Sequence, residues 1–154
     1  VKETHKTLEE KENKGTLFSN VSLDIYQEEG SFLRYKKLFL DAPCHRQFSS
    51  IRTYLEKDAS FKAFFASLGG DLYRQDTLVK LAGKGSHTTL NGLYLAKDEN
   101  TSDYYFQIKH EAPKTTSAQY FKGLSKDKAK GIFQGKISVS ENAEETRSKQ
   151  LNKN

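Results

Sequence analysis

From residue 68 to residue 137 the chain reads as a series of short strands that follow one another with no helix between them. The clearest strand lies in residues 104–112, where large apolar or aromatic residues alternate with more polar ones. One face of it is formed by every second residue, Tyr104, Phe106, Ile108 and His110. Alternation with a period of two is typical of a half-buried strand, because successive side chains point to opposite sides. We therefore expect this region to be all-β.

The same alternation recurs on both sides of that strand. Apolar residues occupy every second position in three further segments: Val21, Leu23 and Ile25; Tyr73, Thr77, Val79 and Leu81; and Phe133, Ile137 and Val139. Gly135 stands among the last set, at a core-facing position that has no room for a side chain. We expect residues 17–151 to contain no helix longer than about two turns.

Small-residue turns punctuate the strands at regular intervals, in multiples of roughly 14 residues. These turns are Gly30-Ser31-Phe32, Ala59-Ser60-Phe61, Gly85-Ser86-His87, Thr101-Ser102-Asp103, Ala129-Lys130-Gly131 and Ala143-Glu144-Glu145. Such a period favours stacked coils of a β-helix over the blades of a propeller. A β-sandwich remains the alternative, because alternation alone does not separate the two folds.

Length and composition limit the number of domains and the kind of fold. A chain of 154 residues with 35% apolar residues suits one domain, and a solenoid tolerates this low content because each coil buries only its inner face. We expect residues 1–15 to be a polar, flexible start and residues 16–154 to form the β-helix core. The chain begins without Met and ends inside a polar run, so we expect it to be a segment of a longer protein.

Charge and apolar runs exclude some partners. The 25 Lys and Arg residues against 20 Asp and Glu give a net charge of +5, spread along the chain. A nucleic-acid-binding protein concentrates its positive charge, so we expect solvated lysines and no nucleic-acid partner. No run of about 18 apolar residues is present, so we expect no membrane span. The single cysteine, Cys44, excludes an internal disulfide and favours a reducing compartment.

The motifs that could indicate a phosphate-binding or metal-binding site are incomplete. Gly83-Lys84-Gly85 and Gly135-Lys136-Ile137 lack the Ser or Thr that follows Gly-Lys in a phosphate-binding loop. The four histidines, His5, His45, His87 and His110, have no metal-ligand spacing, and we expect His110 to be a hydrogen-bonded core residue.

Two further sets of residues could begin a site. Cys44-His45 pairs a thiol with an imidazole, but neighbours in sequence rarely face each other, and we expect a turn there. Four aspartates invite an acid-pair or calcium interpretation, and we expect them at strand ends and turns: Asp71, Asp76, Asp98 and Asp103. The sequence therefore predicts no catalytic, cofactor-binding or metal site.

A longer pattern runs through residues 69–136: a glycine pair, a strand with arginine, L-x-G-x-G, L-N-G-L-Y-L, I-x-H, S-x-Q-x-x-K-G and G-x-F-x-G-K. Its residues are Gly69, Gly70, Arg74, Leu81, Gly83, Gly85, Leu90 to Leu95, Ile108, His110, Ser117, Gln119, Lys122, Gly123, Gly131, Phe133, Gly135 and Lys136. In this pattern the chain resembles the SufB/SufD family of iron–sulfur cluster assembly proteins, and K-G-I-F-Q-G-K-I resembles the SufD branch.

The resemblance implies a right-handed parallel β-helix. It also implies a non-catalytic scaffold subunit that works with a SufB-like paralogue and a SufC-like ATPase, in the bacterial cytoplasm or in plastids. The resemblance carries no cluster-site residue of the family onto this chain, and it identifies no family ligand at Cys44. We therefore expect no cofactor in this segment, with an iron–sulfur cluster present only transiently in the full complex, if at all.

Two other functions stay open from the sequence: a secreted-type carbohydrate-active β-helix enzyme such as a lyase, and a basic module for anionic partners.

Open coils of a solenoid expose unpaired strand edges and apolar inner faces. Phe133, Ile137 and Val139 are expected near such an end, so we expect a concentration-dependent homodimer of the chain.

Overall fold

The computed structural model describes residues 2–5, 15–40 and 42–153. All of its regular structure is β, in eleven strands. They are β1 (Lys2–His5), β2 (Leu17–Gln27), β3 (Phe32–Phe39), β4 (His45–Leu55), β5 (Ser60–Leu68), β6 (Leu72–Leu81), β7 (His87–Ala96), β8 (Thr101–His110), β9 (Thr116–Ser125), β10 (Lys130–Val139) and β11 (Arg147–Lys153). The all-β prediction is confirmed, and no described residue belongs to a helix that could cross a membrane.

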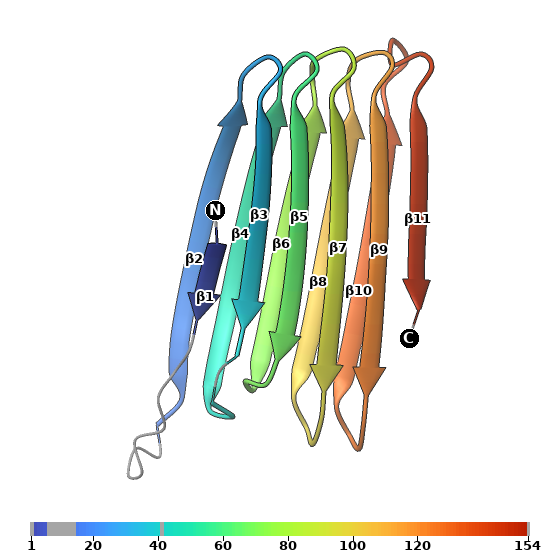
Figure 1. The fold of residues 1–154 in the computed structure, drawn as a ribbon. Coiled ribbons are helices and arrows are strands. Elements are labelled where there is room, and N and C mark those ends of the chain that lie inside the picture. The colour runs from blue at the N-terminus through green and yellow to red at the C-terminus, as the bar shows by residue number, and fades with distance from the viewer. Residues whose placement is uncertain (1, 6–14, 41, 154) are drawn as a thin grey trace.

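The strands form two parallel sheets, one from the odd-numbered and one from the even-numbered strands (Figure 1). Sheet A has the order β1-β3-β5-β7-β9-β11, and sheet B has the order β10-β8-β6-β4-β2. In Figure 1 sheet A lies in front with its strands running downward, sheet B lies behind with its strands running upward, and the coils advance to the right. This is the right-handed winding expected of parallel crossovers, and the predicted β-helix is confirmed.

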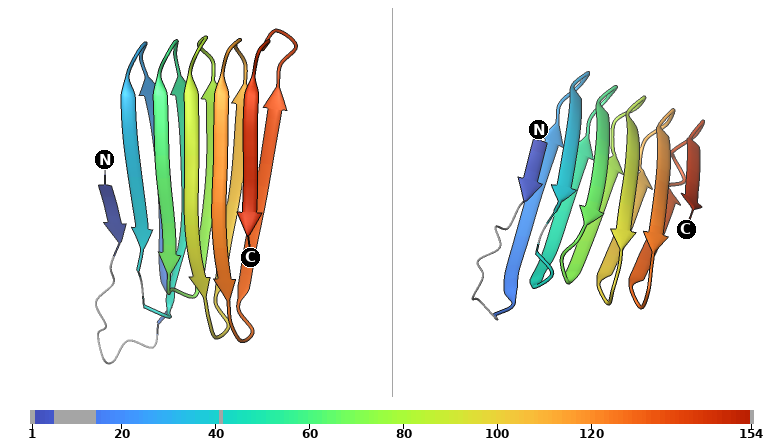
Figure 2. Two further views of the ribbon diagram at one scale, coloured as in Figure 1. Left: turned by 45° about the vertical axis from the view of Figure 1, so that its right-hand side comes forward. Right: turned by 60° about the horizontal axis from the view of Figure 1, so that its bottom comes forward.

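One coil consists of a strand of each sheet and two turns, and Figure 2 shows the coils stacked at regular intervals. Paired residues in sheet B are 26 to 29 positions apart, as in Arg46↔Leu72 and Leu72↔Thr101. The spacing of roughly 14 residues in the sequence therefore corresponds to half a coil.

The turns that lead from sheet B to sheet A share one backbone conformation. Each has one residue in the left-handed region: Gly30, Asp58, Gly85, Lys114 and Glu145. The backbone N–H of this residue donates to the carbonyl that precedes its counterpart in the next coil, as from Asp58 to Lys84 and from Lys114 to Glu144. These hydrogen bonds continue the ladder beyond the strand ends, so the turns stack in register.

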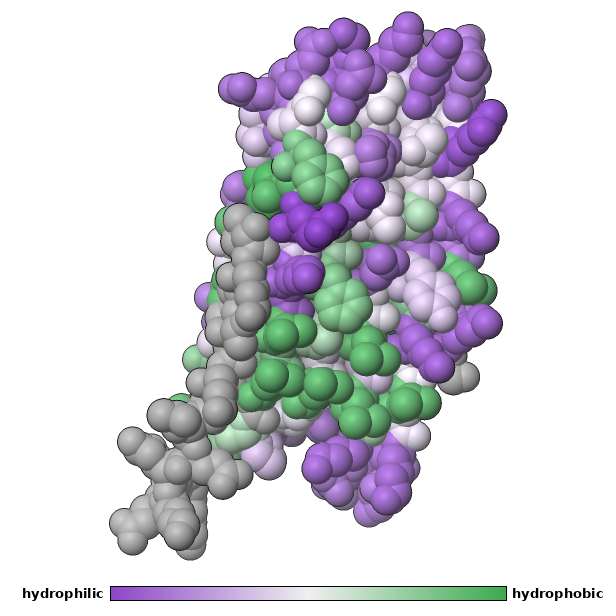
Figure 3. Space-filling view, in the orientation of Figure 1, coloured by the Kyte–Doolittle hydropathy of each residue, from purple (hydrophilic) through white to green (hydrophobic). Residues whose placement is uncertain are grey.

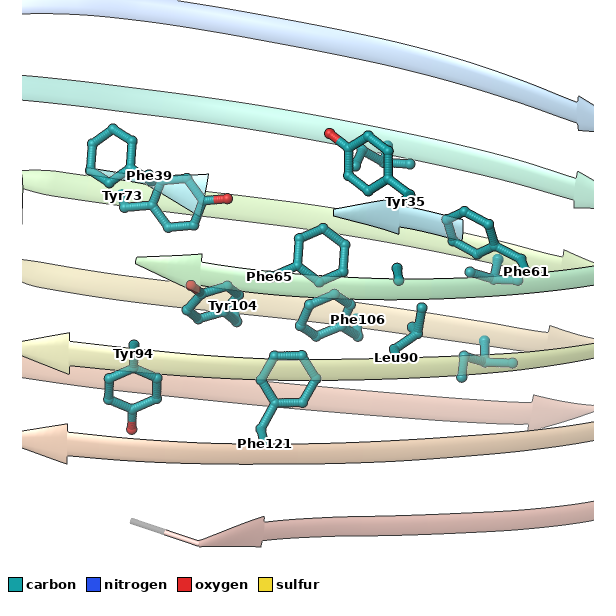
Figure 4. Packing of buried hydrophobic residues seen from close by; sticks show 14 of the residues in the cluster. Tyr35, Phe39, Phe61, Phe65, Tyr73, Leu90, Tyr94, Tyr104, Phe106 and Phe121 are labelled. Atoms are coloured by element: carbon teal, nitrogen blue, oxygen red, sulfur yellow. The ribbon is translucent and has the colours of Figure 1, made fainter. Parts of the chain in front are cut away.

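The interior between the sheets is filled with aromatic rings (Figure 4). Phe106 and Phe121 lie with their ring centroids 4.6 Å apart, and Phe121 packs in turn on Phe133 at 4.8 Å. Further along, Phe39 stacks on Tyr73 at 4.7 Å. Buried rings carry large apolar areas and gain further from such offset contacts, so this column supplies the core that a chain with few aliphatic residues needs.

Inward-facing glycines make room for the rings of neighbouring coils. Phe121 is the register partner of Gly92 and lies over it, so a Cβ at Gly92 would overlap the Phe121 ring. The Tyr94 ring likewise fills the space above Gly123 in β9 and Gly131 in β10. The glycines thus act as holes for aromatic side chains.

Three details differ from the sequence-based expectations. Val139, expected on the core face, is 54% exposed at the end of β10, whereas Phe133 and Ile137 pack against the core. Thr101 opens β8 and is not a turn residue. Residues 2–5, within the expected polar start, pair with β3, and the expectation for residues 6–14 lies outside the described residues.

Candidate functional site

His110 is a satisfied core residue, as predicted. Its side chain is fully buried; Nδ1 lies 2.7 Å from Thr115 Oγ1, and Nε2 lies 3.0 Å from Ser117 Oγ. Burial lowers the pKa of His110, since the charged imidazolium would lose its hydration. Two hydroxyl partners on its two ring nitrogens hold the ring in place, so the I-x-H and S-x-Q motifs form a structural contact.

Cys44 and His45 point to different parts of the molecule. Cys44 is half-buried in the turn before β4, whereas His45 faces inward as the first residue of that strand. His45 Nε2 lies 2.9 Å from Ser19 Oγ in β2. The two side chains therefore do not form a nucleophile pair, which agrees with the expected turn.

His87 contacts a serine on the outer side of sheet A. Its Nε2 lies 2.8 Å from Ser60 Oγ, the register partner in β5. Burial and the nearby charge of Lys62 both lower the pKa of His87. A serine nucleophile needs a base that a third group orients, and the only partner recorded for this ring among the described residues is Ser60. The side chain of His5 lies outside the described residues.

The aspartates occupy two kinds of position. Asp71 and Asp98 lie in turns, as expected, but Asp76 and Asp103 lie within β6 and β8 on the outer face of sheet B. There Arg74 Nε donates to Asp76 Oδ1 at 2.8 Å, and Arg74 Nη1 donates to Asp103 Oδ2. The expectation of strand ends is therefore wrong for Asp76 and Asp103. Outward strand positions accept carboxylates when a neighbouring strand supplies a cation.

This network stabilises the charged form of Arg74. Burial by itself disfavours the charge on Arg74, but Asp103 and Asp76 outweigh it and raise the Arg74 pKa. The two carboxylates are joined through a guanidinium and do not share a proton, so the arrangement lacks the features of an acid–base pair. Among the described residues, no group of three or more His, Cys, Asp or Glu side chains could hold a metal ion.

A lysine lies fully buried inside the solenoid, and sequence patterning did not reveal it. Lys37 of β3 is 0% exposed, and its Nζ donates to Ser49 Oγ of β4 at 2.6 Å. The alternation in β3 places Lys37 inward between Tyr35 and Phe39. That position in the pattern was the one available signal.

The outer face of sheet B has a shallow hollow of about 420 Å³ beside two stacked tyrosines, Tyr26 and Tyr54. Tyr26 donates its hydroxyl to Glu56, and this hydrogen bond is the main reason why the Tyr26 pKa rises to about 12. Arg52 pairs with Asp24 through two hydrogen bonds on the same face. Tyr26, Arg52 and Asp24 are thus each engaged with a neighbouring side chain.

The outer face of sheet A differs, because it carries apolar side chains in rows. Two outward rows cross neighbouring strands, Leu38–Ala66–Leu93 and Leu68–Leu95–Leu124. We call these six residues the leucine patch. It appears as the green band across the lower half of the face in Figure 3. Sequence reasoning missed it, although apolar residues on both faces of β7, as in Leu93-Tyr94-Leu95, were the available signal.

Outward cations are a second feature of this face. From β3 onward the strands of sheet A contain no Asp or Glu, and their outward positions carry seven cations: Arg34, Lys36, Lys62, Lys122, Arg147, Lys149 and Lys153. The two faces therefore differ in their carboxylates, because the strands that carry Asp24, Asp76 and Asp103 all belong to sheet B.

The residues of the family motifs pack against one another in the core. Gly92, Gly123 and Gly131 receive aromatic rings, and His110 bonds Ser117. A family model described as "SUF system FeS cluster assembly, SufBD core domain" matches residues 1–154. The chain belongs to the SufBD core family. The motifs that predicted the family therefore specify how its coils interlock.

Two curated relatives support this assignment. The chain is 26% identical over 137 residues to the iron–sulfur cluster assembly protein SufD of Escherichia coli (strain K12), covering 89% of this chain and 32% of that protein. It is 24% identical over 144 residues to Protein ABCI7, chloroplastic, of Arabidopsis thaliana, covering 92% of this chain and 30% of that protein. The SufBD core chain thus spans about a third of the length of these relatives, and no solved structure gives a significant match.

Proposed function

We propose that the chain is the β-helical core of a non-catalytic scaffold subunit of the SUF iron–sulfur cluster assembly machinery. In the longer protein it would act with a SufB-like paralogue and a SufC-like ATPase, in the bacterial cytoplasm or in a plastid. The match of the SufBD core family to residues 1–154 carries this proposal. A bacterial SufD and a chloroplastic protein among the relatives support it.

The arrangement of reactive side chains supports a scaffold. His110 and Ser117 bond each other in the interior, and the carboxylates of Asp76 and Asp103 are held by Arg74. A polysaccharide lyase gathers carboxylates or bases in an open groove, whereas these groups are engaged with one another. A rigid solenoid offers long outer faces, which suit the holding of other proteins.

The cluster would be cargo of the assembly and not a resident group of this segment. Iron–sulfur clusters are held mainly by several cysteine thiolates, and the chain has one cysteine, Cys44. We expect the purified chain, given iron and sulfide under reducing conditions, to form no stable chromophore. A stoichiometric visible chromophore that disappears in Cys44→Ala would contradict this part of the proposal.

Co-purification tests the scaffold function. The longer polypeptide that contains this chain would be tagged and expressed together with the SufB-like and SufC-like proteins of the same genome. We expect all three proteins to elute together, and we expect no release of unsaturated sugars from polyuronates. A SufB–SufC complex that assembles normally and leaves the tagged protein alone would overturn the proposal.

A further inference from the structure

We propose that the outer face of sheet A docks an acidic amphipathic helix of a partner protein, with the helix lying across the strands over the leucine patch. This proposal rests on the proposed scaffold function, because it names the face and the class of partner. Its argument comes from the leucine patch, from the geometry of the ladder and from the distribution of charge.

The leucine patch contains a row of three exposed leucines. Leu68, Leu95 and Leu124 are 39%, 42% and 54% exposed and stand side by side on β5, β7 and β9. In the parallel row Ala66 is 5% exposed between Leu38 and Leu93. A contiguous apolar patch with a polar surround marks an interaction surface, whereas scattered single apolar residues do not.

The spacing of the rows fits a helix that runs perpendicular to the strands. Neighbouring strands lie about 4.8 Å apart, and one helix face returns about every 5.4 Å. A helix with apolar residues at i, i+4 and i+7 therefore meets Leu68, Leu95 and Leu124 in turn over three coils. The mismatch of about 0.6 Å per step accumulates to less than the width of a methyl group over that distance.

The positive charge of this face favours a helix with acidic residues. Lys36 and Lys122 stand two residues before Leu38 and Leu124 on their strands, on the same outward side, and both are exposed. Lys122 continues the Leu38–Ala66–Leu93 row on β9, and Lys62 lies two outward positions before Ala66 on β5, so the three lysines lie on one side of the Leu68–Leu95–Leu124 row. The strands of sheet A from β3 onward contain no Asp or Glu that could neutralise them. Acidic residues along one edge of the helix would meet these lysines while its apolar stripe covers the leucines.

A protein helix suits this face better than a nucleic acid does. Single-stranded nucleic acids bind through aromatic platforms interleaved with cations. The exposed rings of this face, Phe32, Phe64 and Tyr120, lie outside the leucine patch, whose six residues are all aliphatic. Phosphates would leave the leucine patch uncovered. Burial of the leucines needs an apolar ligand surface.

Peptide titration tests the proposal. The probe is an 18-residue fluorescein-labelled helix with a leucine stripe and glutamate flanks, and its matched control has lysine in place of every glutamate. We expect the acidic peptide to bind the 154-residue chain at least tenfold more tightly than the basic one, with an affinity that falls as salt is raised. Equal binding of the two peptides would overturn the proposal.

Matched variants locate the site. We expect Leu95→Gln/Leu124→Gln to weaken binding of the acidic peptide about tenfold, and Lys36→Gln/Lys122→Gln to weaken it and flatten its salt dependence. The controls lie on the outer face of sheet B: Leu78→Gln/Ile132→Gln and Lys109→Gln/Lys136→Gln should change affinity less than twofold. Circular dichroism checks that every variant keeps its β fold. Unchanged binding by the sheet A variants would overturn the proposal.

Three further outcomes would assign the face to another partner and overturn the helix proposal. The first is tighter binding of a single-stranded DNA oligonucleotide that is lost in Lys36→Gln/Lys122→Gln. The second is tighter binding of phosphatidylserine vesicles that is lost in Leu95→Gln/Leu124→Gln. The third is a dimer of the chain that dissociates in the same leucine variant, measured by sedimentation. The co-purification experiment is independent of these titrations, so failure of one does not imply failure of the other.

Discussion

The outer face of sheet A from β3 onward carries as many cations as the outer face of sheet B, but only sheet B places carboxylates among them. Sheet A, from β3 onward, has seven cations and no Asp or Glu. Sheet B also has seven, at Arg46, Arg52, Arg74, Lys80, Lys109, Lys130 and Lys136, together with three carboxylates, Asp24, Asp76 and Asp103. One face of the solenoid therefore neutralises part of its charge internally, and the other presents it outward.

The inner walls of both sheets combine aromatic rings with glycines, and Gly131 is such a glycine in sheet B. Sheet A contributes glycines at Gly92 and Gly123, and it places Phe121 and Tyr94 next to them. Sheet B contributes the rings of Tyr104 and Phe106, against which Phe121 packs. The strands of sheet A thus combine a closely fitted interior with a surface that has few internal contacts, and substitutions on their two sides should have very different effects.

The largest effect is expected inside sheet A. Phe121→Ala removes a fully buried ring that contacts Tyr104, Phe106 and Phe133, and it should lower the free energy of unfolding by about 3–5 kcal/mol. The adjacent outward residue gives the control: Tyr120 is 43% exposed, and Tyr120→Ala should cost less than about 1 kcal/mol. Urea denaturation of both variants measures the difference. Similar losses would show that the two sides of β9 are not distinct.

A smaller effect is expected where a glycine accepts a ring. The added Cβ in Gly92→Ala overlaps the Phe121 ring, so the variant should lose about 1–3 kcal/mol. Phe121→Leu shortens the opposing side chain, and the double variant should lose less than the sum of the two single losses. Strict additivity in thermal denaturation would contradict the proposed contact.

The next effect compares cations on the two outer faces. Arg74→Gln leaves Asp103, whose side chain is only 14% exposed, without its charged partner, and it should cost about 1–2 kcal/mol. Lys62→Gln on sheet A should change stability by no more than about 0.5 kcal/mol. If urea denaturation gave equal losses of stability for Arg74→Gln and Lys62→Gln, the carboxylates beside Arg74 would not make its face different from that of Lys62.

The smallest effect is a change in pKa at His87. Burial lowers the pKa of His87, and the charge of Lys62 lowers it further, so Lys62→Gln should raise this pKa, measured by NMR titration of the imidazole. Because the pKa of folded His87 is depressed, its contribution to stability is present above its unfolded pKa and is lost as pH falls through the folded pKa. Lys109→Gln on sheet B serves as the control and should leave the His87 titration unchanged. An unchanged titration in Lys62→Gln would contradict the electrostatic interpretation.

Alternation in the sequence predicted which side chains face inward, because that depends only on each strand. It predicted the inward side of Tyr104, Phe106 and Ile108 and the core role of His110 correctly. It did not predict that Asp103 lies beside Arg74, because those residues belong to strands 29 positions apart. Which outward residues of adjacent strands become neighbours depends on the length of the coil between them. One added residue in a turn would therefore change every such pair.

The same reason explains why the leucine patch and the charge of sheet A escaped prediction. Leu68, Leu95 and Leu124 are scattered in the sequence and meet only when β5, β7 and β9 are aligned. Val139 shows the limit of alternation itself, since a residue at the end of β10 has the correct period and remains exposed. The family resemblance was predictable because its motifs mark glycines and rings within one or two coils.

The position of Tyr94 has a consequence for the modularity of the solenoid. Its ring belongs to β7 but occupies space over Gly123 of β9 and Gly131 of β10, so each of these coils is complete only with the other. Shortening the protein by one coil at this joint would leave either a ring without its recess or a recess without its ring. Coils can be exchanged freely only where they meet through ordinary side-chain contacts, which makes this joint a fixed point for recombination or redesign of the repeat.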